Sequence, residues 1–530
     1  MNIRMRAPLV LVGLLCLGMQ ACSDSDVGPT TDTTTDTTTG PVLNPLSENS
    51  AEVFEPSSVI RIASGEGGLD ADLDSGDRFA RDHDAAGDIN GAGVTDLIVG
   101  ARSDDDGAND AGAVYILFMN ADGSVKANQK ISSLAGGFSE QLVQQSFFGY
   151  GVAGIGDYDG DDIPDVAVSA PAAPVPAIYI LHLNKDGTVK SMVKTLHIVG
   201  QGLSAVGDLN NDGRIDLVAA QPGGADSGLT RLLFFNQSSA LIEEDTVTIG
   251  EGEGGFGTGL VTGDSFGGRE SALLGDLDGD GTQELAVGAF ESENGLGAIW
   301  ILSLDSVTYQ VVDKRKLAPG LAGFDETVPL TTNANGSTGG HFGHALVAAG
   351  DLNGDGIPDL ISSANQYSDG VGYVIYLNAD TTVKTFTRIN AEEGGFDLSL
   401  DTDERFGRSI SIVNSARSTG YMNVYMGGGA GANGMGGALY GLEFQACTYE
   451  KQAGNQFWNN GVTLFTNWNH GTQTVTGPLS FEQCVLKAAD SDSTKITVNE
   501  SDGRCVIKDA TSVLASSEEG STSDVRCCPL

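Results

Sequence analysis

Five short acidic segments in this 530-residue chain repeat one arrangement of oxygen-bearing side chains. Each follows the pattern D-x-[DN]-x-[DN]-G-x-x-[DE], except that Ala92 stands at position 5 of the first segment and Asp162 at position 6 of the second. Oxygens from the side chains at positions 1, 3, 5 and 9, with the backbone carbonyl at position 7, can converge on one hard cation, and Gly at position 6 permits the turn between them. The expected ligands are Asp88, Asn90, Val94 and Asp96; Asp157, Asp159, Asp161, Ile163 and Asp165; Asp208, Asn210, Asp212, Arg214 and Asp216; Asp276, Asp278, Asp280, Thr282 and Glu284; and Asp351, Asn353, Asp355, Ile357 and Asp359.

Calcium is the cation that these segments favour. An apolar strand pattern follows each of them instead of a helix, so we expect β-hairpin calcium loops and not EF-hands. Carboxylates crowded into one turn repel one another, and a divalent ion removes that cost. Soluble Asp-Gly turns are the alternative, and Mg²⁺ is disfavoured because it demands octahedral geometry. The sequence predicts about five structural Ca²⁺ sites, of which the first is weakened by Ala92.

The spacing of the acidic segments predicts the elements that hold them. Their first acids are separated by 69, 51, 68 and 75 residues, which is the size of one propeller blade with its loops. Four short β-branched or aromatic runs separated by turn signals indicate one antiparallel sheet in each repeat. A Phe-Gly pair enters most repeats, as at 148–149, 266–267 and 342–343.

A sixth repeat lacks the acids and allows the ring to close. Residues 405–428 keep Phe406-Gly407 and the strand pattern, while residues 57–68 resemble the last strand of a repeat that has no beginning. If the N-terminal strand completes the last blade, the free sheet edges disappear. The predicted fold is all-β: a calcium-binding β-propeller of six blades, with seven as the alternative, followed by a small disulfide-stapled α+β domain.

The acidic loops, the Phe-Gly entry and the small-residue turn after the second strand resemble the FG-GAP repeats of integrin α-subunit propellers. The resemblance covers residues 56–445. Departures are Ala92, Asp162, Glu284, the missing Phe-Gly of the third repeat and the sixth loop without acids. The resemblance implies a propeller that binds calcium and that recognises protein or carbohydrate ligands.

The N-terminal segment reads as an export signal. Arg4 and Arg6 precede an apolar run at 7–17, and Met19-Gln20-Ala21-Cys22 resembles a bacterial lipobox. Residues 1–22 are therefore expected to be a lipoprotein signal with lipidation at Cys22, an ordinary signal peptide being the alternative. Residues 23–55 are rich in Thr and Asp and are expected to form a flexible tether. The chain would then be lipid-anchored in a bacterial cell envelope, at the outer membrane, facing the periplasm or the exterior.

A cysteine-rich module is expected over residues 446–530. Clustered cysteines in an exported segment indicate disulfides, and zinc is the less favoured alternative because no C-x-x-C pair occurs there. Residues 479–510 resemble the core of PAN/apple-like modules. That resemblance implies a Cys484–Cys505 pair and a second pair between Cys447 and either Cys527 or Cys528.

The charge balance limits the partners. With 71 acidic and 28 basic residues, the net charge of −43 disfavours nucleic acid and anionic membrane surfaces, so membrane contact is expected only through the lipid anchor. A propeller on a tether predicts a binding or adhesion protein; a polysaccharide lyase or hydrolase and an envelope scaffold are the alternatives. No catalytic motif was found, and His83, His341 and His344, near the Phe-Gly turns, are interpreted as surface histidines.

Overall fold

A computed structural model gives the fold of the propeller and of seven short strands beyond it. It describes residues 56, 58–172, 175–223, 226–326, 339–353, 355–366, 369–390, 400, 404–414, 421–429, 436–445 and the strands between 450 and 525. The expected signal segment with Cys22, the expected tether, and Cys447, Cys484, Cys527 and Cys528 lie outside the described residues.

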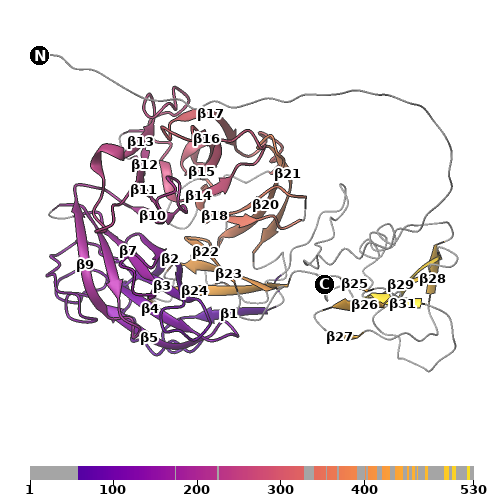
Figure 1. Ribbon diagram of the computed structural model, residues 1–530, viewed down its shortest axis with the longest axis horizontal. Coiled ribbons are helices and arrows are strands. Elements are labelled where there is room, and N and C mark those ends of the chain that lie inside the picture. Colours follow the sequence, from indigo (N-terminus) through magenta and orange to yellow (C-terminus); the bar gives the residue numbers. More distant parts are fainter. Residues whose placement is uncertain are drawn as a thin grey trace, which may run out of the picture. The chain divides into compact units, whose positions relative to one another are not determined.

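Six four-stranded antiparallel sheets make up the propeller (Figure 1). In five of them the strands follow one another in chain order from the innermost to the outermost. These blades are β2 (Phe79–Gly87), β3 (Asp96–Ala101), β4 (Ala113–Met119) and β5 (Val125–Ile131); β6 (Val152–Gly156), β7 (Asp165–Ala170), β8 (Ala177–Leu183) and β9 (Val189–Leu196); β10 (Gly202–Ala205), β11 (Leu217–Gln221), β12 (Leu229–Leu233) and β13 (Val247–Gly250); β14 (Phe266–Gly275), β15 (Gln283–Ala289), β16 (Ala298–Leu304) and β17 (Val311–Leu317); and β18 (Phe342–Gly350), β19 (Asp359–Ala364), β20 (Val371–Leu377) and β21 (Val383–Ile389). Helix is confined, in the described residues, to η1 (Glu243–Asp245) and α1 (Ser292–Gly295).

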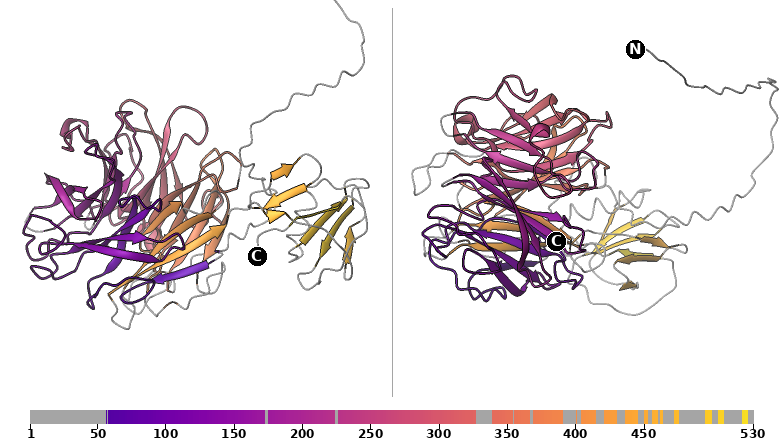
Figure 2. Two further views of the ribbon diagram at one scale, coloured as in Figure 1. Left: turned by 60° about the horizontal axis from the view of Figure 1, so that its bottom comes forward. Right: turned by 60° about the vertical axis from the view of Figure 1, so that its left-hand side comes forward.

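The sixth blade joins the two ends of the propeller sequence. Its inner strands are β22 (Ile410–Asn414), β23 (Tyr421–Gly428) and β24 (Ala438–Gln445). Its outermost strand is β1 (Ser58–Ile62), which pairs with β24 from Ser58 opposite Glu443 to Ile62 opposite Leu439, and Figure 2 shows β1 beside the last blade. Each innermost strand contacts the next around the ring, and β22 contacts β2. The predictions of six blades and of closure by the N-terminal strand are confirmed.

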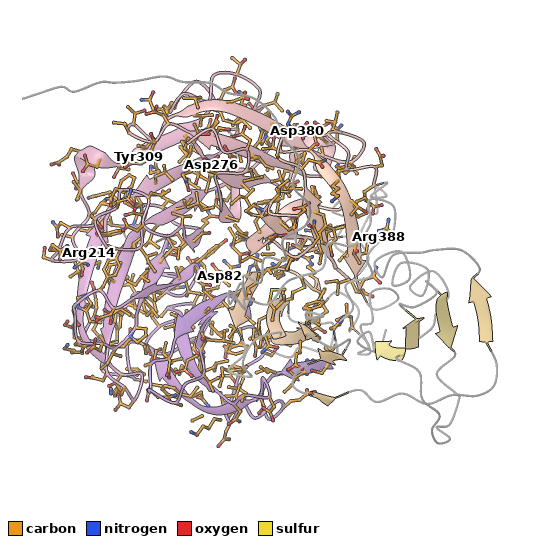
Figure 3. All side chains as sticks on the ribbon, turned by 45° about the vertical axis from the view of Figure 1, so that its right-hand side comes forward. Asp82, Arg214, Asp276, Tyr309, Asp380 and Arg388 are labelled. Carbon is orange, nitrogen blue, oxygen red and sulfur yellow. The ribbon has the colours of Figure 1, made fainter. Side chains whose placement is uncertain are left out.

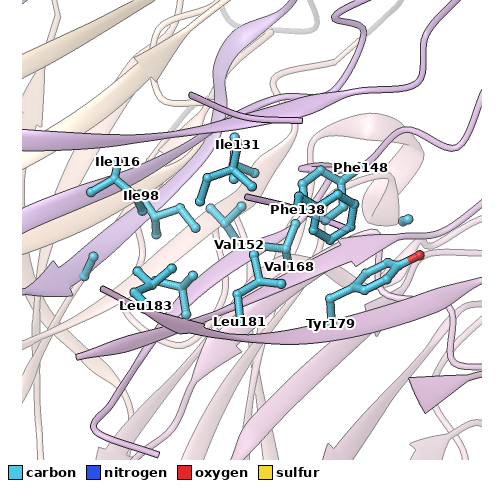
Figure 4. Packing of buried hydrophobic residues seen from close by; sticks show 14 of the residues in the cluster. Ile98, Ile116, Ile131, Phe138, Phe148, Val152, Val168, Tyr179, Leu181 and Leu183 are labelled. Atoms are coloured by element: carbon cyan, nitrogen blue, oxygen red, sulfur yellow. The ribbon is translucent and has the colours of Figure 1, made fainter. Parts of the chain in front are cut away.

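Apolar side chains fill the space between neighbouring blades. Between the first two blades, Ile98 and Ile116 face Val168 and Leu181, all fully buried (Figure 4). The second and third strands of a blade are buried on both faces, as in β4 and β8, because each sheet has a neighbour on either side. Burying one such side chain contributes roughly 1.5–3 kcal/mol, so the interfaces between blades supply most of the driving force for folding.

The Phe-Gly pair fixes how each inner strand begins. Phe148 is fully buried, and its ring meets that of Tyr179 edge-on at 5.5 Å between centroids. Gly149 has φ 82°, and a Cβ placed there would lie 2.4 Å from the Ala113 carbonyl oxygen, so only Gly fits without a shift. The first blade departs from this rule, because Ala80 adopts φ 57° in a region that L-residues rarely occupy.

The C-terminal strands form two separate sheets. One contains β25 (Glu450–Gln452), β26 (Gln456–Asn459) and β27 (Val462–Thr463). The other has the order β28-β30-β29-β31 and consists of β28 (Thr472–Val475), β29 (Lys495–Asn499), β30 (Arg504–Lys508) and β31 (Thr522–Val525). Strands β29 and β30 pair antiparallel, with Lys495 opposite Lys508 and Asn499 opposite Arg504. The helix and the disulfides expected for this module remain predictions.

Ring closure predicts a sharp effect of truncation. A chain that starts at residue 64 loses β1, including the buried Ile62, and exposes the edge of β24. We expect its free energy of unfolding to fall by at least about 3 kcal/mol and its tendency to aggregate to rise. Thermal denaturation and light scattering measure both. A chain that starts at residue 56 is the control and should melt like the longer protein; equal melting of the two truncations would contradict closure by β1.

Candidate metal centre

The five acidic segments lie at one end of the propeller. Each connects the innermost strand of its blade to the second strand; the first, for example, runs from the end of β2 at Gly87 to the start of β3 at Asp96. The innermost strands occupy equivalent places in the ring, so their ends bring all five loops to the same face (Figure 1). We call this the loop face. The propeller thus repeats one local structure five times.

The position-1 carboxylate organises the turn of every loop. In the first loop Asp88 accepts the backbone N–H groups of Ala92 at 2.8 Å and Gly93 at 2.7 Å. Asp157, Asp208, Asp276 and Asp351 accept the equivalent N–H groups of positions 5 and 6 in their own loops, at 2.8–3.1 Å. The chain therefore wraps around this carboxylate, which leaves the later acids of the loop facing it.

Two loops gather three carboxylates at distances that suit a shared ion. Asp157, Asp159 and Asp165 in the second loop each offer an oxygen, and these oxygens lie within 4.8 Å of one another. Asp276, Asp278 and Asp280 do the same in the fourth loop. Such a set of hard oxygen donors fits Ca²⁺, which binds carboxylates at about 2.3–2.6 Å. The other three loops carry Asn at position 3, so amide oxygens replace one carboxylate there.

A second turn depends on the acid at position 5. The position-7 N–H donates to this carboxylate in four loops: Ile163 to Asp161 at 3.0 Å, Arg214 to Asp212 at 2.9 Å, Thr282 to Asp280 at 2.7 Å and Ile357 to Asp355 at 2.9 Å. In the first loop Ala92 has no carboxylate to accept the N–H of Val94. This difference is the physical basis of the weaker first site that the sequence predicts.

The position-9 acid is buried and ties the loop to its blade. Asp165 is fully buried; it accepts the N–H of Tyr158 in the loop at 2.9 Å and that of Leu183 at the end of β8 at 2.9 Å. Asp96 and Asp359 make the same two kinds of bond in their blades. The acid therefore has a structural role that does not require an ion, in addition to its role as an expected ligand.

Burial perturbs these acids strongly. It raises the pKa of Asp165 to about 6 despite the two N–H donors, with smaller contributions from the nearby charges of Asp159 and Asp157. Burial raises the pKa of Asp216 and of Asp359 to about 7 in the same way. Near neutral pH a cation in the loop would therefore stabilise the ionised form of groups that burial alone drives toward protonation.

Lysines from the outermost strands reach two of the loops, which the sequence analysis missed. Lys190 Nζ, on β9, lies 2.7 Å from Asp159 Oδ2 and 2.6 Å from Asp161 Oδ2. Lys384 Nζ, on β21, lies 3.2 Å from Asp355 Oδ2. Both lysines directly follow the first valine of their strand, and the fourth blade has Val312 at that position. Of the two loops that gather three carboxylates, the second thus has a lysine in contact with its acids, and the fourth has a valine at the equivalent position.

The interpretation of three histidines as surface residues is wrong. His83, His341 and His344 are 2%, 4% and 5% exposed. His83 binds Ser409 Oγ at 2.5 Å and the Tyr425 carbonyl at 3.0 Å, both from the sixth blade. Burial lowers the pKa of His83 to about 4, so it is neutral near pH 7. The error arose because the residues near each Phe-Gly turn are covered by neighbouring blades.

Comparisons with known proteins agree with this repeat structure. The FG-GAP-like repeat family matches residues 157–219, and the FG-GAP repeat family matches residues 268–302 and 342–377. The chain is similar to integrin alpha pat-2 of Caenorhabditis briggsae, 28% identical over 282 residues that cover 49% of this chain and 22% of that protein. It is also similar to integrin alpha-V of Gallus gallus, 28% identical over 268 residues that cover 48% of this chain and 24% of that protein.

These relatives are much longer than the matched region, which spans about a quarter or less of their length. Among solved structures, the Dos1 propeller aligns with a TM-score of 0.30 and 13% identity, covering 63% of this chain and 64% of that one. The fold assigned to this chain rests on its own six sheets and on the repeat matches. The chain contains an FG-GAP β-propeller similar to those of integrin α chains.

Substitutions of a buried position-9 acid and of an exposed position-3 acid should differ in their cost to the stability of the metal-free protein. Asp165→Ala leaves the N–H groups of Tyr158 and Leu183 without acceptors, and we expect it to cost about 2–4 kcal/mol of stability. Asp278→Ala removes an exposed side chain that accepts only the N–H of Asp280, and its cost should stay within about 0.5 kcal/mol. Denaturant unfolding in the presence of a chelator measures both. Equal costs would show that the ninth carboxylate has no structural role of its own.

Proposed function

We propose that this FG-GAP β-propeller is a calcium-stabilised binding or adhesion protein held at a bacterial cell envelope. The observation that carries the proposal is the fivefold repetition of the acidic loop on one face, with three carboxylates gathered in each of two loops. A scaffold in which five loops bind cations is expected to be rigid. Rigidity is what a protein needs if it presents a ligand-binding surface outside the cytoplasm.

Calcium fits these loops better than other common cations. The side chains at positions 1, 3, 5 and 9 would hold it, with the carbonyl at position 7, and about five ions are expected. When bound, Ca²⁺ supplies positive charge that offsets repulsion among the clustered carboxylates. Extracellular calcium modules commonly bind with dissociation constants of about 10⁻⁴–10⁻³ M, so this stabilisation suits an exported protein.

The proposed membrane anchoring rests on the N-terminal segment. Cys22 would carry the lipid, and residues 23–55 would hold the propeller away from the membrane. Within the described part of the chain, no helix combines the length and apolar character that crossing a bilayer requires. Cys22 with more than one acyl chain, at the start of a polar tether, would be enough to keep the propeller at the envelope surface.

Ligand binding is the role that the relatives favour. The matched proteins are integrin α chains, and the region shared with them is the repeat region. We propose that the propeller binds a protein or carbohydrate ligand on the face opposite the loops, and that the cysteine-rich segment provides a second contact. The loop face is committed to cations, so the opposite ends of the same strands remain for recognition.

Calcium should control stability in a pH-dependent way. Raising free Ca²⁺ to about 100 times its dissociation constant contributes about 2.7 kcal/mol for each site, so the melting temperature of the protein from residue 23 onward should rise by more than about 10 °C over the chelated state. Asp216 and Asp359 have pKa values of about 7 in the folded metal-free state, above their ordinary value of 3.8. The folded state therefore binds protons that the unfolded chain has released, and this contribution to stability is lost as the pH rises through 7.

Because calcium binds the ionised carboxylates, it must displace those protons at pH 6.5 but few of them at pH 8. The gain in melting temperature should accordingly be larger at pH 8 than at pH 6.5, and Mg²⁺ should give a smaller gain than Ca²⁺. Differential scanning fluorimetry with Ca²⁺, Mg²⁺ and EDTA at both values tests this. A melt that EDTA leaves unchanged would remove the calcium proposal.

The binding role is tested with a glycan array and a pull-down from envelope extract. We expect the protein from residue 23 onward to retain a defined glycan or protein in millimolar Ca²⁺ and to release it in EDTA as the propeller loosens. Asp278→Ala should show the same ligand at saturating calcium, because its loop between β14 and β15 lies on the face opposite the proposed binding surface. Turnover of a bound polysaccharide would instead support the enzyme alternative and overturn the proposal of a pure binding protein.

A further inference from the structure

Arginines gather at the end of the ring opposite the loop face, in a chain whose net charge is −43. Arg81 lies on β2 and Arg269 on β14; Arg102 follows the last residue of β3, and Arg408 precedes β22. These positions are the starts of innermost strands or the end of a second strand, while the acidic loops occupy the other ends of the same strands. We call this end the channel mouth.

The Phe-Gly turn places these side chains. In four blades a polar residue directly follows the Phe-Gly pair, or its variant Phe79-Ala80: Arg81, Tyr150, His344 and Arg408. In the fourth blade along the chain, Arg269 comes one residue later. The pairing register shifts at this point: Phe79 is opposite Ala101, but His83 is opposite Val99. Three residues of β2 therefore oppose a single residue of β3, and the bulge frees them from the regular ladder. Five of the six blades thereby contribute a cationic or hydrogen-bonding side chain at the mouth.

Contacts across the ring show that the mouth is narrow. The guanidinium carbon of Arg102 in the first blade lies 4.2 Å from the ring centroid of Tyr150 in the second. The guanidinium carbon of Arg269 in the fourth blade lies 4.7 Å from the same centroid. Below them, Glu270 of the fourth blade accepts the N–H of Ile410 in the sixth at 3.2 Å. Asp82 also lies near the centre of the ring (Figure 3). Acidic side chains thus also lie near the centre of the ring.

The arginines are buried or half-buried, and among the described residues they form no ion pairs. Arg102 is 7% exposed and Arg408 is 6% exposed. The Nε atoms of Arg81, Arg102, Arg269 and Arg408 are buried and donate to no acceptor, and among the described residues none of the four forms an ion pair with a carboxylate. Arg269 Nη1 donates to the Gln201 carbonyl at 3.1 Å. Each guanidinium carries five N–H donors, and in all four arginines the Nε–H donor at least is left without an acceptor.

Other groups at the mouth are also short of partners. His344 Nδ1 and Asn365 Oδ1 are buried without a hydrogen bond among the described residues. Asn365 follows β19 in the fifth blade as Arg102 follows β3 in the first. Buried polar groups are normally paired, and a set of them left unpaired in one place indicates that a partner outside the chain completes it.

The local electrostatics are those of a positive site. Burial alone would raise the pKa of Tyr150, but the charges of Arg269, Arg102 and Arg81 outweigh it and lower this pKa to about 8. Burial, together with the repulsion of Arg405, Arg269 and other arginines, lowers the pKa of Arg408 to about 9. Burial raises the pKa of Asp82 and of Glu270 well above the ordinary range, while the charge of Arg269 acts to lower the pKa of Asp82.

We propose that the channel mouth binds one oxyanion group, which is a carboxylate, sulfate or phosphate at the end of a ligand. The guanidinium groups of Arg102, Arg408 and their neighbours donate the hydrogen bonds that hold it. Guanidinium groups bind such oxygens through paired hydrogen bonds. A single end group is favoured over a long polyanion because Glu270 joins the fourth and sixth blades within the ring, and the negative charge elsewhere on the chain repels extended anions. This inference deepens the proposed binding role and rests on it, but it does not depend on ions in the loops.

Calorimetric titration of the protein from residue 23 onward, in Ca²⁺ and at constant ionic strength with chloride as the balancing anion, tests the inference. The probes are sulfate, phosphate, acetate and glucuronate, which distinguish the possible end groups. We expect saturable binding of at least one probe at one site per chain. Arg102→Gln and Arg408→Gln should each weaken it by at least about tenfold, the scale of one lost charge-assisted hydrogen bond. Arg315→Gln, on the outermost strand β17, removes the same charge elsewhere and should leave binding unchanged.

A second readout reports the site directly. Anion binding neutralises part of the arginine charge, so the pKa of Tyr150 should rise, and its absorbance at alkaline pH should shift in wild type but not in Tyr150→Phe. This measurement holds even if an arginine variant fails to fold. No saturable binding of any probe beyond chloride, equal weakening by Arg315→Gln, or tighter binding of heparin than of the single-group probes would each overturn the inference. A wild-type protein that calcium stabilises but that binds no probe refutes this inference alone; one that binds a probe but ignores calcium refutes only the loop proposal.

Discussion

The propeller depends on how five of its six blades hold a buried carboxylate at the start of the second strand. The ninth acid of the loop is removed from water, and its charged form is costly in the interior. In the first, second and fifth blades backbone N–H groups of two different segments converge on it. Through it the hairpin, the second strand and the end of the third strand share one hydrogen-bonded centre. The remaining acids of the loop are arranged around this point, so the geometry of the expected cation site follows from a bond that exists without the cation.

The same innermost strand carries opposite chemistry at its two ends. Toward the loop face it leads into clustered acids, and toward the channel mouth it begins with a Phe-Gly turn followed by Arg, Tyr or His. Burial of the Phe ring between blades fixes the turn, and the turn fixes the next side chain at the mouth. A very acidic chain thereby keeps a small positive site that is separated from its negative loops by the length of a strand. Stabilisation and recognition can then be served by different ends of one repeat.

Much of this arrangement could be predicted from sequence, because the repeat signals are local. The loop pattern and the Phe-Gly pair lie within about twenty residues of one another, and their recurrence gave the blades, their number and the closing role of β1. Lys190 and Lys384 were missed because they belong to a different strand and approach the acids only after the sheet has formed. The histidines were misplaced for a related reason: polar residues beside a turn suggest solvent, whereas the next blade covers them. Arg102 and Arg408 are visible in the sequence, but nothing local shows that they lack acidic partners.

The most direct measurement of the central claim is a crystal structure of the protein from residue 23 onward, grown in millimolar Ca²⁺ and analysed by anomalous scattering. The account predicts an anomalous peak within each of the five acidic hairpins, weakest at Asp88, where Ala92 leaves a ligand missing, and coordination by the side chains at positions 1, 3, 5 and 9. Hairpins that show no anomalous peak, with their carboxylates turned to solvent or to lysines, would contradict it.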